Sequence, residues 1–243
     1  MKDVFLDFSQ VETGDILLFS GYSELSVGVH LATTSRWNHA GIAVWLNKDL
    51  CSKLNITTNL VGENNKILCI LESNNDLSFD MYTQSIMNAA GLMSMEPQIK
   101  KSSLIACRKI SVTRDDNFYD KTVEFIKKCS RKKYRESYVD VSLGWLGILG
   151  VTNDTICSEL CARYLEHIGL VSKAWVINND PKSMMPAIFG IEMDMFPDGT
   201  FLYNKPIVIM QRKSKFDWRF LAVVIIVIVI IILIIIFRKR TLR

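Results

Sequence analysis

Cys157 is the residue of this sequence whose surroundings best suit a chemical role. The pattern from 155 to 168 predicts a helix that is capped by Thr155 and closed by Gly169, which places the thiol in the first helical turn. Free backbone N–H groups and the helix dipole favour an anion there, so they lower the pKa of a thiol and can stabilise an oxyanion. We therefore predict that Cys157 is a nucleophile, whereas Cys161 fits the commoner pattern of a buried apolar cysteine.

A thiolate enzyme also needs a general base, and the sequence has three histidines. His167 lies about 15 Å along the same predicted helix, too far to take the proton of the thiol. His30 falls in a segment of ambiguous pattern, whereas His39 opens a predicted strand and is the candidate base. Glu72 ends the next predicted strand and is the candidate carboxylate that orients the imidazole. An ordinary strand-end histidine and a solvated carboxylate at a strand exit remain the alternatives for these two residues.

The cysteines indicate neither a metal centre nor a disulfide framework. They stand at positions 51, 69, 107, 129, 157 and 161, without a CxxC spacing or a neighbouring histidine. A zinc site formed by His39, Glu72 and Cys157 is an alternative that lacks a fourth ligand. We therefore predict free thiols in a reducing compartment, with no metal and no cofactor.

Hydrophobic patterning predicts the elements that must position these side chains. Strands are expected at 14–21, 39–46, 66–72, 103–111 and 203–211, and helices at 22–35, 116–128, 138–149 and 155–168. The polar, Asn-rich segment 47–65 reads as a surface connection, and 170–200 as irregular chain. The sum is a mixed α+β domain with a strand-rich N-terminal half.

Composition excludes several classes of protein. The chain has 243 residues, of which 49% are hydrophobic and 22% charged, so it is neither disordered nor collagen-like. Its net charge of +4 arises in residues 219–243, which hold five basic and no acidic residues. The rest carries 24 basic against 25 acidic residues, without the cationic footprint of a nucleic-acid-binding domain. We expect no nucleic-acid partner.

The C-terminal region predicts a membrane anchor. Residues 220–237 form a run of 18 residues without a polar side chain, long enough as a helix to span about 27 Å of bilayer. A basic linker at 212–219 precedes the run, and a basic tail at 238–243 follows it. Because the N-terminus lacks a signal-peptide pattern, we expect a single-pass tail anchor in the lipid bilayer, with residues 1–211 on the cytoplasmic side.

Four short motifs together resemble a known superfamily. In chain order they are Gly14-Asp15-Ile16-Leu17-Leu18-Phe19, Asn38-His39-Ala40-Gly41-Ile42, Leu71-Glu72-Ser73 and Ile156-Cys157-Ser158-Glu159-Leu160. Their order is similar to the circularly permuted branch of the NlpC-type papain-like superfamily. That branch includes lecithin retinol acyltransferase-like enzymes, bacterial YiiX-like proteins and proteins of poxviruses and other large DNA viruses. The resemblance spans roughly residues 11–211 and implies an α+β papain-like domain with an antiparallel sheet packed on a cysteine-bearing helix.

The resemblance also implies roles for individual residues. It implies that Cys157 is the nucleophile, His39 the base and Glu72 the residue that orients the histidine. For Asp15, in the Gly-Asp turn, it implies a substrate-binding or structural role. Tyr134 matches the groove-side tyrosine of the family loosely, without the aspartate that usually follows it.

These roles imply a membrane-anchored cysteine hydrolase or acyltransferase that acts on an amide, ester or thioester of a lipid or a peptide. This sequence departs from the family in an insertion at 47–65 and in the membrane anchor, and both departures leave the substrate open. The viral members extend the expected location to a virion membrane. The alternative is a catalytically idle membrane-tethered adaptor or virion structural protein that keeps the fold. The sequence indicates no oligomeric state.

Overall fold

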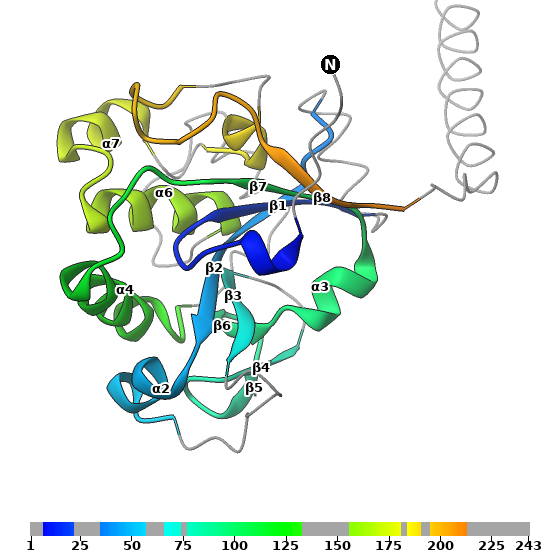
Figure 1. Cartoon of the computed structure of the whole chain (residues 1–243), viewed down its shortest axis with the longest axis vertical. Helices are drawn as coiled ribbons and strands as arrows, with labels where there is room; N and C mark the ends of the chain where they lie inside the picture. The colour runs from blue at the N-terminus through cyan, green and yellow to red at the C-terminus, as the bar shows by residue number, and fades with distance from the viewer. Residues whose placement is uncertain are drawn as a thin grey trace, which may run out of the picture. The chain divides into compact units, whose positions relative to one another are not determined.

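The computed structural model describes residues 7–21, 35–56, 66–73, 77–132, 156–180, 184–190 and 195–212 (Figure 1). The chain separates into two units, residues 1–211 and 212–243, and every helix and strand named below belongs to the first. The helices predicted at 22–35 and 138–149 and the membrane span predicted at 220–237 lie, apart from residue 35, outside the described residues. Within the described ranges, no helix has the length and apolar character needed to cross a bilayer.

An antiparallel sheet is the centre of the first unit. In the described part of the chain it has eight strands: β1 (Ile16–Gly21), β2 (His39–Leu46), β3 (Ile67–Ser73), β4 (Ser78–Asp80), β5 (Ser85–Met87), β6 (Ala90–Ser94), β7 (Ser102–Arg108) and β8 (Ile207–Gln211). Their order is β5-β4-β6-β3-β2-β1-β7-β8, and all neighbours pair antiparallel. The strands predicted at 14–21, 39–46, 66–72 and 103–111 are confirmed as β1, β2, β3 and β7, and the second half of 203–211 as β8.

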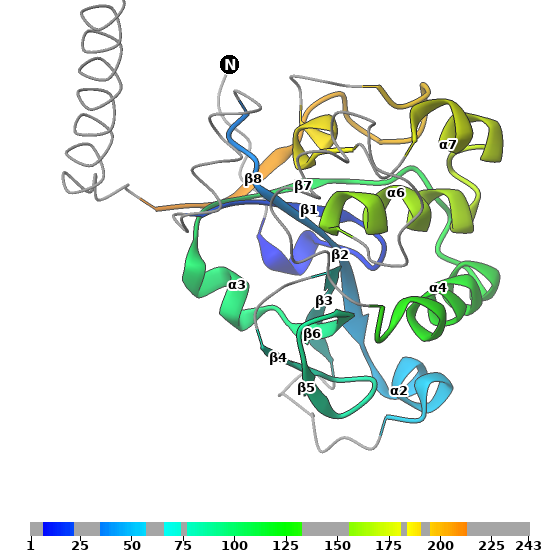
Figure 2. The same ribbon diagram turned by 180° about the vertical axis from the view of Figure 1, so that it is seen from behind.

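Helices cover both faces of the sheet. They are α2 (Lys48–Leu54), α3 (Glu96–Lys101), α4 (Asp116–Cys129), α6 (Cys157–Ile168) and α7 (Lys173–Asn179), with short 3₁₀ turns η1 (Phe8–Gln10) and η3 (Pro186–Phe189). Apolar residues of α2, α4 and α6 pack on the face that carries Ile42 and Leu71. Ile99 of α3 packs on the opposite face, which carries Ala43 and Ile70. Figures 1 and 2 show these two helical layers, α3 on one face and α2, α4 and α6 on the other, in two views related by a half-turn.

Two segments in which the sequence predicts no helix each contain one. The segment 47–65 contains α2, which begins after Asn47, whose side chain accepts a hydrogen bond from the backbone N–H of Leu50. Leu50 and Leu54 are its only buried residues, four apart, so the apolar signal of this helix is weak. The segment 170–200 likewise contains α7, which is capped by Ser172.

The predicted helix 116–128 is confirmed as α4. The predicted helix 155–168 is confirmed as α6, which starts two residues later than expected. Its first residue is Cys157, and Ile156 occupies the cap position in an extended conformation without a side-chain hydrogen bond. Thr155, for which a capping role is predicted, lies outside the described residues. The helix ends as predicted at Gly169, which has a φ of 89°.

Replacing Gly14 by alanine is expected to lower the free energy of unfolding by about 3 kcal/mol. Gly14 has a φ of +93°, and an added Cβ would lie 2.8 Å from both Ile110 Cδ1 and Phe118 Cζ. Tyr164 Oη would lie 3.0 Å away, so these buried side chains would have to shift in addition to the strain in the backbone. Gly199 is a matched control, because it has a φ of +82° but no atom within 4 Å of its added Cβ. Urea denaturation should show a loss of only about 1 kcal/mol for Gly199→Ala, and equal losses for both variants would contradict the packing argument.

Candidate active site

The pairing of β2 with β3 brings His39 and Glu72 together. His39 is the first residue of β2 and Glu72 lies next to the end of β3, so the antiparallel arrangement puts both at the same end of the sheet. The register pairs Ile42 with Leu71, which makes His39 and Glu72 diagonal neighbours on one face. Glu72 Oε2 lies 2.6 Å from His39 Nε2.

Cys157 reaches this end of the sheet from the helical layer. It is the first residue of α6, a helix that packs on β2 and β3. Because α6 begins there, its first N–H groups have no partner within the helix and face the thiol region. The next residue, Ser158, is fully buried and its hydroxyl donates a hydrogen bond to the carbonyl of Met184, which fixes this end of the helix.

The three side chains form one hydrogen-bonded chain. His39 is hydrogen-bonded to Cys157 as well as to Glu72. Since Nε2 faces the carboxylate, Nδ1 is the ring nitrogen that remains for the thiol. Cys157 is 7% exposed and Glu72 2%, whereas 19% of the His39 side chain is open to solvent. The site is therefore shielded but is not sealed at the imidazole.

The pKa values of this pair shift towards a thiolate and an imidazolium. Burial acts against both charges, but the attraction between Cys157 and His39 and the hydrogen bond between them outweigh it. The pKa of Cys157 is therefore lowered, with help from the backbone N–H groups of Ala40 and Ser158. The pKa of His39 is raised, and the negative charge of Glu72 contributes to this rise.

Gln98 is a member of the site that the sequence patterns did not reveal. It lies on α3, on the far side of the sheet from α6, and is 9% exposed. Its Nε2 lies 2.9 Å from Oε1 and 2.8 Å from Oε2 of Glu72. Gln98 thus holds the carboxylate in the orientation in which it meets the imidazole of His39. No signal in a six-residue helix that contains Pro97 could have identified this contact.

Replacing Gln98 by methionine, which keeps the volume but removes the donor, should weaken the ion pair. We expect the alkylation of Cys157 at neutral pH to slow about tenfold, because one hydrogen bond to a charged group is worth about 1.5 kcal/mol. The pH profile of alkylation should shift to higher pH, which a purely structural role would not cause. Lys100→Met on the same helix is the control, since the Lys100 side chain is 72% exposed and pairs with Glu96 instead. An unchanged profile for Gln98→Met would contradict the positioning role.

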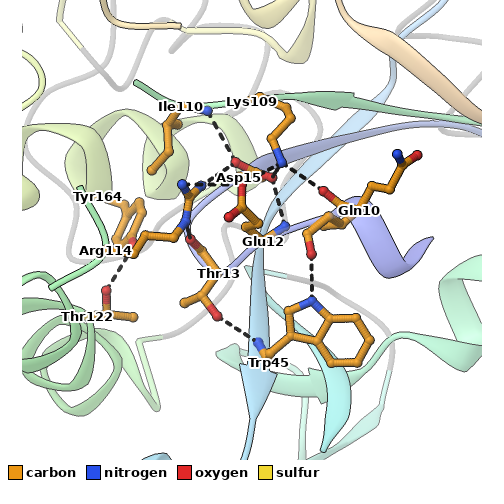
Figure 3. A network of polar contacts seen from close by, with 11 residues as sticks. Gln10, Glu12, Thr13, Asp15, Trp45, Lys109, Ile110, Arg114, Thr122 and Tyr164 are labelled. Atoms are coloured by element: carbon orange, nitrogen blue, oxygen red, sulfur yellow. Dashed lines mark hydrogen bonds and ion pairs between the residues drawn. The ribbon is translucent and has the colours of Figure 1, made fainter. Parts of the chain in front are cut away.

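Asp15 belongs to a separate buried network (Figure 3). Its carboxylate is fully buried and contacts Arg114 Nη2 at 2.7 Å and Lys109 Nζ at 3.2 Å. It also accepts hydrogen bonds from the backbone N–H groups of Glu12 and Ile110. Burial raises the pKa of Asp15, and these donors and cations partly oppose that rise. The contacts described for this network do not include Glu72, His39 or Cys157.

The remaining cysteines differ from Cys157 in their electrostatics. Burial raises the pKa of Cys69, Cys107, Cys129 and Cys161, and Cys51 is half-buried. Cys161 lies one turn along α6, where the negative charges of Cys157 and Glu72 oppose its ionisation further. Its predicted role as a buried apolar residue agrees with this position.

Tyr134, a predicted site residue, and His30, a histidine weighed as a base, both lie outside the described residues. His167 lies at the other end of α6, where its ring contacts Phe125. Across the described ranges, no group of three or more His, Cys, Asp or Glu side chains is arranged to hold a metal ion.

Among solved structures, the chain is similar to that of the metalloprotein yiiX from Escherichia coli O157:H7. The alignment covers 84% of this chain and 99% of that one, at 14% sequence identity and a TM-score of 0.46. No family model matches the chain. No curated protein matches it either.

Proposed function

We propose that the protein is a cysteine hydrolase or acyltransferase that acts on an amide, ester or thioester. The observation that carries this proposal is the hydrogen-bonded chain from Glu72 through His39 to Cys157, in which the pKa of the thiol is lowered. Acyl transfer by a thiol requires a nucleophile, a base in contact with it and a carboxylate that orients the base, and these three residues meet in that order. Their order along the chain is also the order in the permuted papain-like enzymes that the sequence motifs resemble.

The proposed reaction has two halves. The thiolate of Cys157 attacks the carbonyl carbon, and the oxygen of the tetrahedral intermediate takes the negative charge. Backbone N–H groups at the start of α6 are positioned to stabilise that charge. His39 gives its Nδ1 proton to the leaving amine, alkoxide or thiolate, and the acyl group stays on the sulfur as a thioester.

In the second half, His39 accepts a proton from water or from another acceptor, whose oxygen or nitrogen then attacks the thioester. Collapse of the intermediate releases the acyl product and restores the thiolate and the imidazolium. Glu72 keeps the ring in place and favours its charged form in both halves, and Gln98 keeps Glu72 in place.

The membrane anchor predicted at 220–237 is part of the same proposal. A tail anchor would hold residues 1–211 at the cytoplasmic surface of a bilayer or at a virion membrane. Lipid and lipidated substrates are then favoured by proximity, and a peptide amide is the other substrate class. The proposal includes no metal and no nucleic acid.

The direct test is to trap the acyl group. The full-length chain in detergent is mixed with a p-nitrophenyl ester, a fatty acyl thioester or a peptide anilide. The chain is then digested, and the mass of each cysteine-containing peptide is measured by mass spectrometry. We expect an acyl adduct on Cys157 alone and a burst of leaving group equal to the enzyme present. Cys157→Ser should lose both, whereas Cys161→Ser on the same helix should keep them.

Absence of both the adduct and the burst with all three substrate classes would overturn the proposal. The chain would then be the idle membrane-tethered adaptor or virion component. That outcome would leave the fold and the hydrogen bonds of the site unchanged.

A further inference from the structure

A hollow of about 430 Å³ lies away from the residues of the candidate active site. Its wall is formed by the end of α2, the turn between β4 and β5, and the end of α4. The polar residues that line it are Asn55, Tyr82, Thr83, Lys127, Ser130 and Arg131. Figures 1 and 2 both show α2 beside α4 in this region.

The wall of this hollow is cationic. Lys127 and Arg131 line it, and none of the described residues that line it is acidic. The carboxylate of Asp80, at the end of β4 just before this turn, accepts hydrogen bonds from the backbone N–H groups of Tyr82, Thr83 and Leu92 and from the Thr83 hydroxyl. Asp80 is fully buried, so it holds the turn in shape and presents no surface to the hollow.

Arg131 stands where the backbone favours glycine. Residues 129–132 form a turn closed by a hydrogen bond from Lys132 N to Cys129 O, with Ser130 at φ −55° and ψ 138° and Arg131 at φ 69°. These are the angles of a type II turn, whose third residue is usually glycine. A further hydrogen bond from Arg131 N to Ala90 O keeps the turn on the sheet.

An arginine at this position costs conformational free energy that a glycine would save. Lysines in the last turn of α4 complement the helix dipole, which accounts for Lys127 and Lys128. The dipole does not account for a charged residue in the left-handed region after the helix. In the described part of the chain, the Arg131 guanidinium has no ion-pair partner, and the side chain is exposed.

We propose that this hollow is a binding site for a phosphate monoester. The planar guanidinium of Arg131 pairs with two phosphate oxygens, and the ammonium of Lys127 supplies a second positive charge. Lys127 Nζ already lies 2.8 Å from the carbonyl of Lys53, which holds the ammonium at the wall. Asn55 and Tyr82 offer neutral donors. The volume accommodates the esterified group as well as the phosphate, which is carried by a lipid headgroup or by a soluble metabolite.

The test uses the full-length chain in detergent and calorimetric titration with three probes. These are glycerol 3-phosphate, dihexanoyl phosphatidic acid and, as a phosphodiester control, dihexanoyl phosphatidylcholine, all at one ionic strength. We expect the monoesters to bind and the diester not to bind. Binding of phosphatidic acid alone identifies a lipid headgroup, binding of glycerol 3-phosphate alone identifies a soluble ester, and binding of both supports the shared chemistry.

Arg131→Gly separates binding from stability. Because glycine suits the turn, we expect an unchanged or higher melting temperature together with at least tenfold weaker monoester binding. Lys127→Gln should also weaken binding, whereas Lys48→Gln, an equal charge change at the start of α2 and outside the lining, should not. Wild-type affinity in Arg131→Gly, or the failure of both monoesters to bind the wild type, would overturn the proposal.

Discussion

Replacing His39 by alanine is expected to slow acylation of Cys157 by about 10²–10⁴-fold, the range that a positioned acid–base group contributes. The variant removes the cation that lowers the pKa of the thiol and the donor that protonates the leaving group. It also removes the two hydrogen bonds of the imidazole, one with the thiol of Cys157 and one with the carboxylate of Glu72. What stays is a thiol that is 7% exposed, at a helix start, without a base.

The direction of the pH effect follows from the two pKa shifts. In the wild type the pKa of Cys157 is lowered, so the thiolate forms at lower pH than in an ordinary cysteine, and the rate of iodoacetamide alkylation rises there. In His39→Ala only burial and the two backbone donors act on the thiol. Burial raises the pKa of the thiol, so the rise in rate should move to higher pH.

Alkylation read for each cysteine by peptide mass measures this shift within one chain. The pKa values of Cys69, Cys107, Cys129 and Cys161 are raised, so these thiols serve as internal references. His167→Ala is the matched control, since it removes an imidazole from the other end of α6. If the profile of Cys157 in His39→Ala coincided with that of the wild type, the ion pair would not exist.

Replacing Asp15 by alanine is expected to lower the free energy of unfolding by about 3–5 kcal/mol, the usual cost of breaking a buried ion pair. The variant leaves Arg114 and Lys109 without their buried anion, although their side chains are only 14% and 11% exposed. It also leaves the buried N–H of Ile110 without its acceptor. Urea denaturation followed by far-UV circular dichroism measures the loss.

Glu12 provides the control for Asp15, because it contacts the same two cations. Its side chain is 49% exposed, so water replaces much of what the ion pairs supply. We expect Glu12→Ala to cost less than about 1 kcal/mol. Similar losses for Asp15→Ala and Glu12→Ala would show that burial is not what makes Asp15 important.

The parts of the fold that sequence patterns predicted are those with strong local signals. β2 and β3 are continuous apolar runs, and α4 buries Phe118, Val123, Phe125 and Ile126 at helical spacing, as expected. The positions of Cys157 and His39 at the starts of their elements were also predictable, because both follow turn-like sequence.

The missing parts depend on tertiary contacts. Strands β4 and β5 have three residues each, too few for an alternating pattern, and α3 has six. Gln98 gains its role only when α3 packs on the sheet, so its residue type and spacing carry no signal. The predicted start of α6 is two residues too early, because Ile156 at its cap position has no side-chain acceptor that a sequence pattern could mark.

The split of the site between an early strand pair and a late helix has a consequence for synthesis. His39 precedes Cys157 by 118 residues, which a ribosome adds in roughly 6–24 s at about 5–20 residues per second. β2 and β3, with the imidazole and its carboxylate, are therefore made before Cys157 is added to the chain. The ion pair between Cys157 and His39 can form only after α6 has docked on β2, so the nascent chain lacks this pair until its body has folded.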